Sequence, residues 1–236
     1  VDWLQFLLAL PIISIGLTVL AVAALINANN IIDGLNGLAS GSSICMALSF
    51  LIVAYKVGDT EVAFATTAIL ASVAGFFVWN FPFGRVFLGD GGAYILGLFI
   101  AGIAVMLPER NPEVSPFCSF LIVLFPLYEM SRSTTRRFFS DRSRIFEPDD
   151  RHLHSLMFRV LSVRLTMSRV LQNSLAASLI LLLPIGTSIW AVANFDDRNM
   201  LIFGVNGFVC AYEIFNIAIY RVCINKIISF LIILYM

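Results

Sequence analysis

The side chains best suited to chemistry lie in residues 27–38, which read Asn-Ala-Asn-Asn-Ile-Ile-Asp-Gly-Leu-Asn-Gly-Leu and follow a long apolar segment. If the helical pitch continues, Asn27, Asn30 and Asp33 are spaced i, i+3 and i+6 and share a sector of about 120°. Two amides and a carboxylate on one face suit a polar ligand, and Gly34 would let a phosphate approach the backbone. The alternative interpretation is an ordinary glycine- and asparagine-rich loop between two helices.

A second polar stretch, residues 80–90, precedes another apolar run and ends on Asp90 among the glycines Gly89, Gly91 and Gly92. A carboxylate at a helix start can be a simple cap. A cap does not need three glycines, however, whereas glycines let a bulky anion approach the free N–H groups and positive dipole end of the helix. A phosphate-bound Mg²⁺ held by one or two carboxylates suits this arrangement, and we therefore favour a site over a cap.

A third polar stretch, residues 131–169, is basic and contains nine of the fifteen lysines and arginines. Some of these arginines suit anionic lipid headgroups. His152 and His154 are the only two histidines, and their i, i+2 spacing puts them on one side only if the segment is extended or looped. Two imidazoles are a weak metal signal, but beside Arg151 they suit a diphosphate. A histidine pair without function is the alternative.

The elements that must position these loops are membrane helices. The chain has 236 residues, of which 59% are hydrophobic and 13% charged, and its mean hydropathy is +0.91. This is too apolar for a water-soluble core, and the apolar runs are continuous, which favours helices over a barrel. We predict an all-α transmembrane bundle of about seven to eight spans. The runs are 3–26, 39–55, 62–79, 91–107, 115–128, 175–193 and 200–220, with 227–236 starting an eighth.

Charge distribution predicts the orientation of these spans. Loops dense in arginine face the cytoplasm, so residues 131–169 are assigned to that side. Counting spans backwards then puts residues 27–38 and 80–90 on the same side. We therefore expect a single multi-pass domain, residues 1–236, whose three polar loops form one composite site at the cytoplasmic surface. The four cysteines show no metal-type spacing and are expected to be small hydrophobic residues within helices.

The first two loops resemble those of the polyprenyl-phosphate N-acetylhexosamine-1-phosphate transferases, glycosyltransferase family 4. The family pattern Asn-Ala-x-Asn-x-x-Asp-Gly-x-Asp-Gly-Leu is met by residues 27–38, except that Asn36 replaces the second aspartate. The pattern Phe-Leu-Gly-Asp-x-Gly-Ser/Ala is met by residues 87–93.

The third loop is similar to the family in two places. Residues 126–137 resemble its Pro-x-x-Asp and Arg-Arg pattern with Glu129 in place of aspartate, in a form nearer to the N-acetylglucosaminyl branch than to the peptidoglycan enzyme. Residues 148–155 resemble its histidine motif, with Asp150 and Ser155 as departures.

This resemblance implies a reaction and a site. A polyprenyl (undecaprenyl) phosphate would attack a UDP-N-acetylhexosamine at the bacterial inner membrane, releasing UMP and starting a cell-envelope polysaccharide such as O-antigen. It implies Mg²⁺ as the cofactor, with Mn²⁺ as the alternative. The partners implied are the two substrates, membrane lipids and a second copy of the chain in a homodimer, but no nucleic acid. The residues implied are Asp33 and Asp90 as metal ligands and catalytic groups, His152 as a further catalytic residue, and Asn27, Asn30, Asn36, Gly89, Arg151 and His154 as substrate contacts.

One family motif, Asp-Asp-x-x-Asp in an upstream loop, has no counterpart. We expect it to precede Val1 in a longer protein, and we expect this piece alone not to catalyse the transfer. A non-catalytic remnant or scaffold of the family is the main alternative. A transporter is disfavoured, because transporters place ionisable groups midway along their spans.

Overall fold

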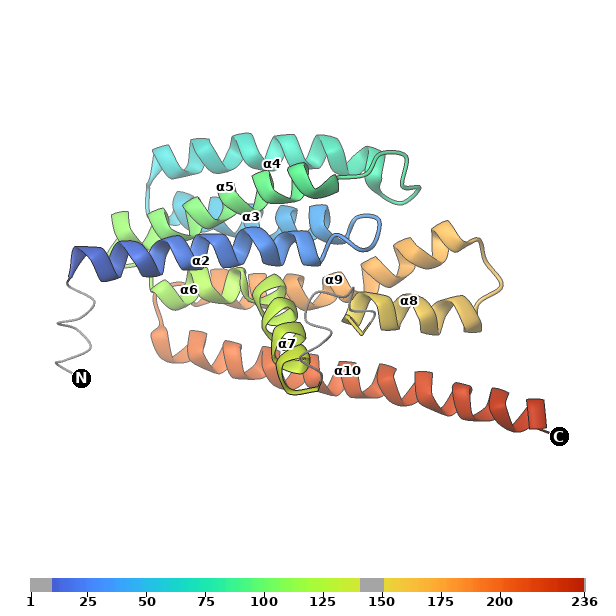
Figure 1. The fold of residues 1–236 in the computed structure, drawn as a ribbon. Coiled ribbons are helices and arrows are strands. Elements are labelled where there is room, and N and C mark those ends of the chain that lie inside the picture. The colour runs from blue at the N-terminus through green and yellow to red at the C-terminus, as the bar shows by residue number, and fades with distance from the viewer. Residues whose placement is uncertain (1–9, 141–150, 236) are drawn as a thin grey trace.

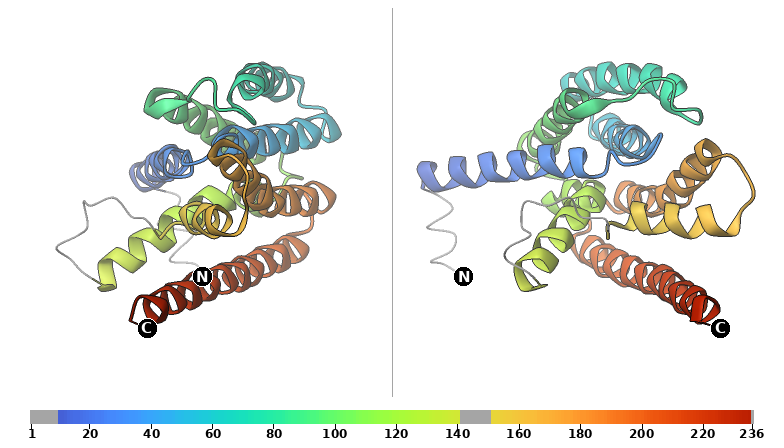
Figure 2. Two further views of the ribbon diagram at one scale, coloured as in Figure 1. Left: turned by 90° about the vertical axis from the view of Figure 1, so that its right-hand side faces the viewer. Right: turned by 45° about the vertical axis from the view of Figure 1, so that its right-hand side comes forward.

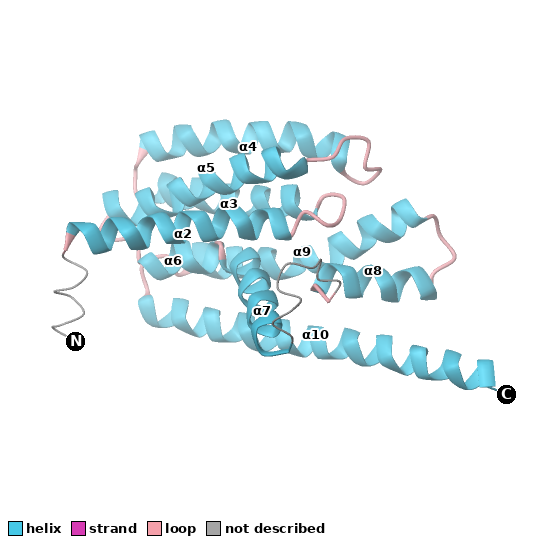
Figure 3. Cartoon of the chain, in the orientation of Figure 1, coloured by secondary structure: helices cyan, strands magenta, loops and turns pink. Residues whose placement is uncertain are grey.

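The computed structural model describes residues 10–140 and 151–235 as helices joined by short turns (Figures 1 and 3). No strand occurs in this described part, and the predicted all-α architecture is confirmed. The helices are α2 (Pro11–Ile31), α3 (Leu38–Lys56), α4 (Thr60–Asn80), α5 (Gly89–Arg110), α6 (Pro116–Ile122), α7 (Leu124–Ser140), α8 (Leu153–Arg164), α9 (Arg169–Ala193) and α10 (Arg198–Tyr235).

Six helices of the described part are long and apolar enough to cross a membrane, namely α2, α3, α4, α5, α9 and α10 as far as Cys223. They match six of the predicted apolar runs, although residues 3–9 of the first run lie outside the described part. The chain is therefore a multi-pass membrane protein built as a helix bundle.

Two details of the predicted spans are wrong. The run 115–128 is not one span, because the helix breaks at Val123 into α6, of seven residues, and α7, which turns away from the other helices (Figure 1). Pro126 explains the break: proline cannot continue a preceding helix but is tolerated in the first turn of a new one. The run 227–236 starts no separate span either, because α10 continues through Tyr235.

Close helix packing depends on small residues. At Gly97 of α5 an added Cβ would lie 2.7 Å from the Cα of Ile26, so α2 and α5 touch backbone to backbone. At Gly41 of α3 an added Cβ would lie 2.8 Å from the side chain of Leu181, so this glycine makes room for a leucine of α9. Helix α3 packs against α4, α5 and α9, and its Phe50 is fully buried. The two views in Figure 2 show this helix enclosed by its neighbours.

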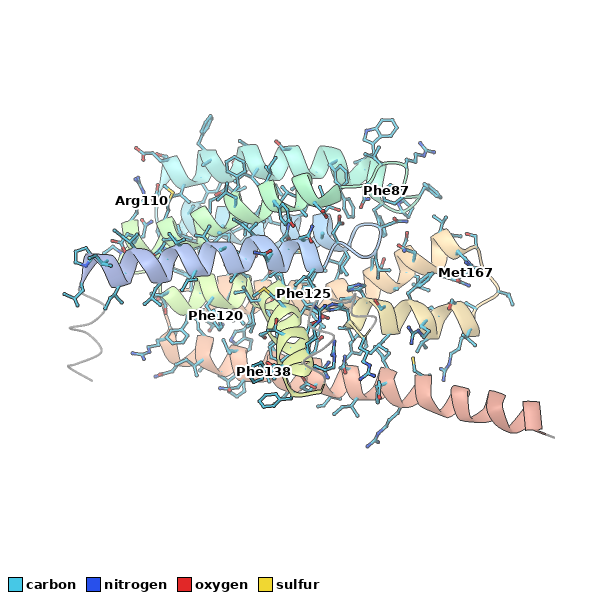
Figure 4. The ribbon with its side chains drawn as sticks, in the orientation of Figure 1. Phe87, Arg110, Phe120, Phe125, Phe138 and Met167 are labelled. Carbon is cyan, nitrogen blue, oxygen red and sulfur yellow. The ribbon has the colours of Figure 1, made fainter. Side chains whose placement is uncertain are left out.

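The turns gather at two opposite ends of the bundle, which in Figure 4 are marked by Phe87 and Arg110 on the two ends of α5. One end carries the turns 32–37, 81–88 and 165–168, and the other carries 57–59, 111–115 and 194–197 (Figure 1). The turns of the first two polar stretches and the last turn of the third therefore share one end, whereas residues 131–140 and 153–164 of the third, predicted as a loop, lie in α7 and α8. That this end faces the cytoplasm stays a prediction.

The opposite end contains an ion-pair network that sequence reasoning missed. Asp59 caps α4 by accepting a hydrogen bond from the Val62 N–H (3.1 Å), and it also accepts from Arg110 Nε (2.9 Å) and Asn111 Nδ2 (3.0 Å). The hydrogen bond from Arg110, aided by those from Val62 and Asn111, lowers the pKa of Asp59 to about 2 despite its burial. The network ties the turn before α4 to the end of α5.

Candidate functional site

The end of α2 is fixed by Asn29, an amide that the sequence analysis did not single out. Its Nδ2 donates to the carbonyl of Ala93 on α5 (2.9 Å), and its Oδ1 accepts from Ser43 Oγ on α3 (3.4 Å). The side chain is fully buried, where an unpaired amide would be costly. Asn29 therefore holds the three helices together directly beneath the polar loops.

Two carboxylates meet one turn further on. Asn30 Nδ2 donates to Asp90 Oδ1 (2.8 Å), which joins α2 to the first turn of α5. The Asp33 carboxylate accepts a hydrogen bond from the Gly89 N–H, and Gly89 has φ +66°, a conformation that favours glycine. Burial raises the pKa of Asp33 to about 6; the Gly89 N–H opposes this rise and the nearby Asp90 adds to it.

These carboxylates fit a magnesium ion that also binds a substrate phosphate. No group of three or more His, Cys, Asp or Glu side chains gathers among the described residues, so a metal cage made of protein alone is not found there. Mg²⁺ needs only one or two carboxylates when phosphates supply further oxygens. A divalent cation between Asp33 and Asp90 would also offset the burial and the like charge that disfavour the Asp33 carboxylate.

The histidines lie against the same loop. A Cβ added at Gly34 would lie 2.3 Å from His154 Nε2, so the backbone of the 32–37 turn rests directly on the imidazole. His152 is the extended N-cap residue of α8, and the rings of His152 and His154 stack with their centroids 5.2 Å apart. The prediction of an extended or looped segment holds only for His152, because His154 already lies in the first turn of α8; the change from extended to helical backbone at Leu153 lets the two rings stack.

One ring nitrogen of His152 contacts a buried carboxylate. Glu129 of α7 lies 3.3 Å from His152 Nδ1 and accepts a hydrogen bond from Tyr212 of α10 (2.7 Å). All three side chains are buried. A carboxylate on one ring nitrogen fixes the orientation of an imidazole. No sequence signal could reveal this contact, because Glu129 and Tyr212 are 83 positions apart.

Side chains of α4 and α9 anchor the 32–37 turn. The N–H of Gly37, whose φ is +82°, donates to Asn80 Oδ1 (2.6 Å), and the N–H of Asn36 donates to Asn173 Oδ1 (2.7 Å). The Asn36 amide packs against Gly84, where an added Cβ would lie 2.7 Å from it. Asn36, which belongs to the 32–37 turn, therefore also contacts the 81–88 turn.

Two predicted site residues lie elsewhere. Asn27 is exposed, and its Nδ2 donates to the carbonyl of Ala23 in its own helix (2.7 Å). Its expected convergence with Asp33 fails because α2 ends at Ile31, so the helical pitch does not extend to Asp33. Arg151 is exposed and lines a cavity between α7 and α10. The predicted motif residues 148–150 lie outside the described part.

Residues 3–108, which contain both the Asn30–Asp33 segment and Asp90, match the model of glycosyl transferase family 4. This part of the chain is similar to that family. The family 4 match ends before the histidines, so the packing of His154 on Gly34 joins a further segment to the matched one.

Relatives with curated names agree with family 4. The chain is 33% identical over 135 residues to the undecaprenyl-phosphate alpha-N-acetylglucosaminyl 1-phosphate transferase of Thermotoga maritima, covering 57% of this chain and 40% of that protein. It is 31% identical over 148 residues to the Escherichia coli K12 protein of the same name, covering 61% and 40%. It is 38% identical over 108 residues to the phospho-N-acetylmuramoyl-pentapeptide-transferase of Moorella thermoacetica, covering 46% and 33%. The chain thus spans less than half the length of each relative.

Proposed function

We propose that this chain carries the metal and sugar-nucleotide site of a polyprenyl-phosphate N-acetylhexosamine-1-phosphate transferase. The donor is a UDP-N-acetylhexosamine, and the acceptor is a polyprenyl phosphate such as undecaprenyl phosphate. The acceptor phosphate attacks the β-phosphate of the donor, the bond to the α-phosphate breaks, and UMP leaves. The names of the family 4 relatives support this proposal.

The observation that carries the proposal is the joining of three loops at one end of the bundle. Asn30 binds Asp90, Asp33 accepts from Gly89, and Gly34 packs on His154. Two carboxylates and an imidazole thus lie around Gly34, which has no side chain. A diphosphate with its metal needs this combination of anionic metal ligands, hydrogen-bond donors and open backbone.

Phosphoryl transfer depends on positioning and charge more than on covalent help from the protein. Bound Mg²⁺ would supply charge neutralisation for the diphosphate. Asn30 orients the Asp90 carboxylate, and the Asp33 carboxylate is held beside it by the Gly89 N–H. We assign His154, which packs on Gly34 beside the two carboxylates, as a donor to a phosphate oxygen, and Glu129 fixes the orientation of the His152 ring.

The test is a binding measurement on the purified chain in neutral detergent. Calorimetric titration with UDP-N-acetylglucosamine should show binding in the presence of Mg²⁺ that EDTA abolishes. Asp90→Asn should weaken it by roughly 10- to 150-fold, the equivalent of one hydrogen bond or contact to a charged group. Glu113→Gln, which removes an exposed carboxylate at the opposite end of the bundle, is the matched control and should bind like wild type.

The assignment of the metal site would be overturned if binding did not depend on Mg²⁺. It would also be overturned if Asp90→Asn and Glu113→Gln changed the affinity equally. UMP release after adding undecaprenyl phosphate measures the transfer itself. Release by the chain alone would contradict the expectation that further aspartates are needed for catalysis, whereas binding without release agrees with it.

A further inference from the structure

Helices α7 and α10 each carry the dipeptide Tyr-Glu and exchange hydrogen bonds through it. The Tyr212 hydroxyl of α10 donates to Glu129 Oε1 on α7 (2.7 Å), and the Tyr128 hydroxyl of α7 donates to Glu213 Oε1 on α10 (2.9 Å). The two tyrosine rings meet edge to face, with their centroids 4.7 Å apart. A reciprocal pair of contacts therefore fixes the two helices against each other.

The two halves of this exchange differ in burial and in what their carboxylates contact. Glu129 and Tyr212 have exposed fractions of only 3% and 0%, whereas Glu213 is partly exposed and also accepts from Arg132 Nε (2.9 Å). The second oxygen of Glu129 lies 3.3 Å from His152 Nδ1. Through this contact the Tyr212–Glu129 half reaches the candidate site.

The donors and acceptors around Glu129 decide which nitrogen of His152 carries a hydrogen. An ionised carboxylate only accepts hydrogen bonds, and Glu129 uses one oxygen for the Tyr212 hydroxyl. An imidazole donates to the other oxygen only when its Nδ1 carries a hydrogen. In the neutral ring the lone pair then lies on Nε2. Two donors on a buried carboxylate also avoid the cost of leaving it unpaired.

We propose that Tyr212 and Glu129 are positioning residues that keep a hydrogen on His152 Nδ1, so that Nε2 of the neutral ring acts as a hydrogen-bond acceptor. Tyr212 acts through Glu129, because its hydroxyl holds the carboxylate that contacts the imidazole. The Tyr212 ring is itself held by packing: it is fully buried and also contacts Phe208, with ring centroids 5.9 Å apart.

The stacking of the two imidazoles passes this orientation on to the 32–37 turn. The rings of His152 and His154 are parallel within 6°, and His154 rests on Gly34. A fixed His152 ring therefore limits where the His154 ring can lie. Under the proposed function, on which this step rests, the two histidines have different tasks. His154 donates to a phosphate oxygen, and His152 accepts from a hydroxyl or N–H group of the sugar nucleotide.

The first measurement reads the tautomer and needs no activity. His152 and His154 are the only histidines of the chain, so protein labelled with ¹⁵N-histidine gives the ring signals of two residues, and those lost in His152→Gln belong to His152. The ¹⁵N shift of a ring nitrogen shows whether it carries a hydrogen. Wild-type His152 should have one on Nδ1. Glu129→Gln should move it to Nε2, because Tyr212 still donates to the amide oxygen and the amide NH₂ then faces the ring.

The second measurement tests the coupling of Tyr212 to the site. Tyr212→Phe removes the hydroxyl and keeps the ring, so it should weaken Mg²⁺-dependent binding of UDP-N-acetylglucosamine by roughly 2- to 10-fold in calorimetric titration. Added to His152→Gln, it should have little further effect, because the residue through which it acts is gone. Tyr128→Phe is the matched control: it loses the reciprocal hydrogen bond to Glu213 but leaves Glu129 on the imidazole, so tautomer and affinity should stay those of wild type.

The proposal would be overturned if Nδ1 of wild-type His152 carried no hydrogen, or if the hydrogen stayed on Nδ1 in Glu129→Gln. Equal losses of affinity in Tyr212→Phe and Tyr128→Phe would also overturn it, because the exchange would then only pack α7 on α10. If the wild-type chain bound no sugar nucleotide, the proposed function would fail, and the ¹⁵N shifts would still decide whether Glu129 sets the tautomer of His152.

Discussion

The contact between Gly34 and His154 offers a test of the candidate site that changes no charge. In Gly34→Ala, the new Cβ would lie 2.3 Å from His154 Nε2, whereas ordinary contacts begin near 3.4 Å. The ring or the turn must therefore shift by about 1 Å. A hydrogen bond from His154 to a phosphate would not survive such a shift, and its loss corresponds to about 1.5–3 kcal/mol.

We therefore expect Gly34→Ala to weaken Mg²⁺-dependent binding of UDP-N-acetylglucosamine by roughly 10- to 150-fold in calorimetric titration. Backbone strain adds nothing, because Gly34 is not among the glycines with positive φ. Gly102→Ala, further along α5, is the matched control, since an added Cβ there meets nothing within 4 Å and φ is ordinary. It should bind like wild type.

A double substitution tests whether the effect passes through the imidazole. His154→Ala removes the atoms that the new Cβ would meet, so adding Gly34→Ala to it should have little further effect. If Gly34→Ala weakens binding as strongly in the absence of the ring as in its presence, the turn acts by another route and the contact with His154 has no part in the site.

Three further outcomes follow from the structure. Burial and the nearby Asp90 raise the pKa of Asp33 to about 6, so protons should compete with Mg²⁺ for this carboxylate. Calorimetric titrations should therefore show a lower Mg²⁺ affinity at pH 5 than at pH 7.5. Asp33→Asn should remove most of this pH dependence. The pKa of Asp59 is lowered to about 2, so its stabilising effect is present above about pH 4 and lost as pH falls towards 2. Asp59→Asn should cost about 1–3 kcal/mol in thermal unfolding at pH 7, because Arg110 loses this carboxylate and keeps only its ion pair with Glu61, and the substitution should flatten the acid loss. Arg85→Cys and Glu113→Cys, in a variant without native cysteines, should react with an impermeant thiol reagent from opposite sides of the membrane. Labelling of both cysteines from the same side would contradict the prediction that the two ends of the bundle lie on opposite sides of the membrane.

Hydropathy predicted most of the fold because lipid leaves few choices for an apolar run of about twenty residues. It failed at Val123, where the run is continuous in apolarity but Pro126 already carried the signal of a helix end. Spacing predicted the polar face of α2 as far as Asn30. It could not show where the helix ends, and so it misplaced Asn27 relative to Asp33.

Contacts between distant segments were beyond the sequence. Residues 27–38 contain four asparagines, and nothing in one sequence shows that Asn29 is the buried clamp while Asn30 faces Asp90. Arg151 adjoins His152 in the sequence, yet it lines the cavity between α7 and α10. The partnership of Glu129 with Tyr212 and His152 arises only when α7 bends away at Val123, which the hydropathy pattern does not encode.

The anchoring of the 32–37 turn has a consequence for hydrogen exchange. The N–H groups of Asn36 and Gly37 donate to side-chain oxygens of Asn173 and Asn80, so these loop amides exchange only when α4 or α9 moves away. They should show the slow exchange of helix interiors despite lying in a glycine-rich turn. A turn that is already ordered loses little conformational entropy when a nucleotide binds, which leaves more of the contact energy for affinity.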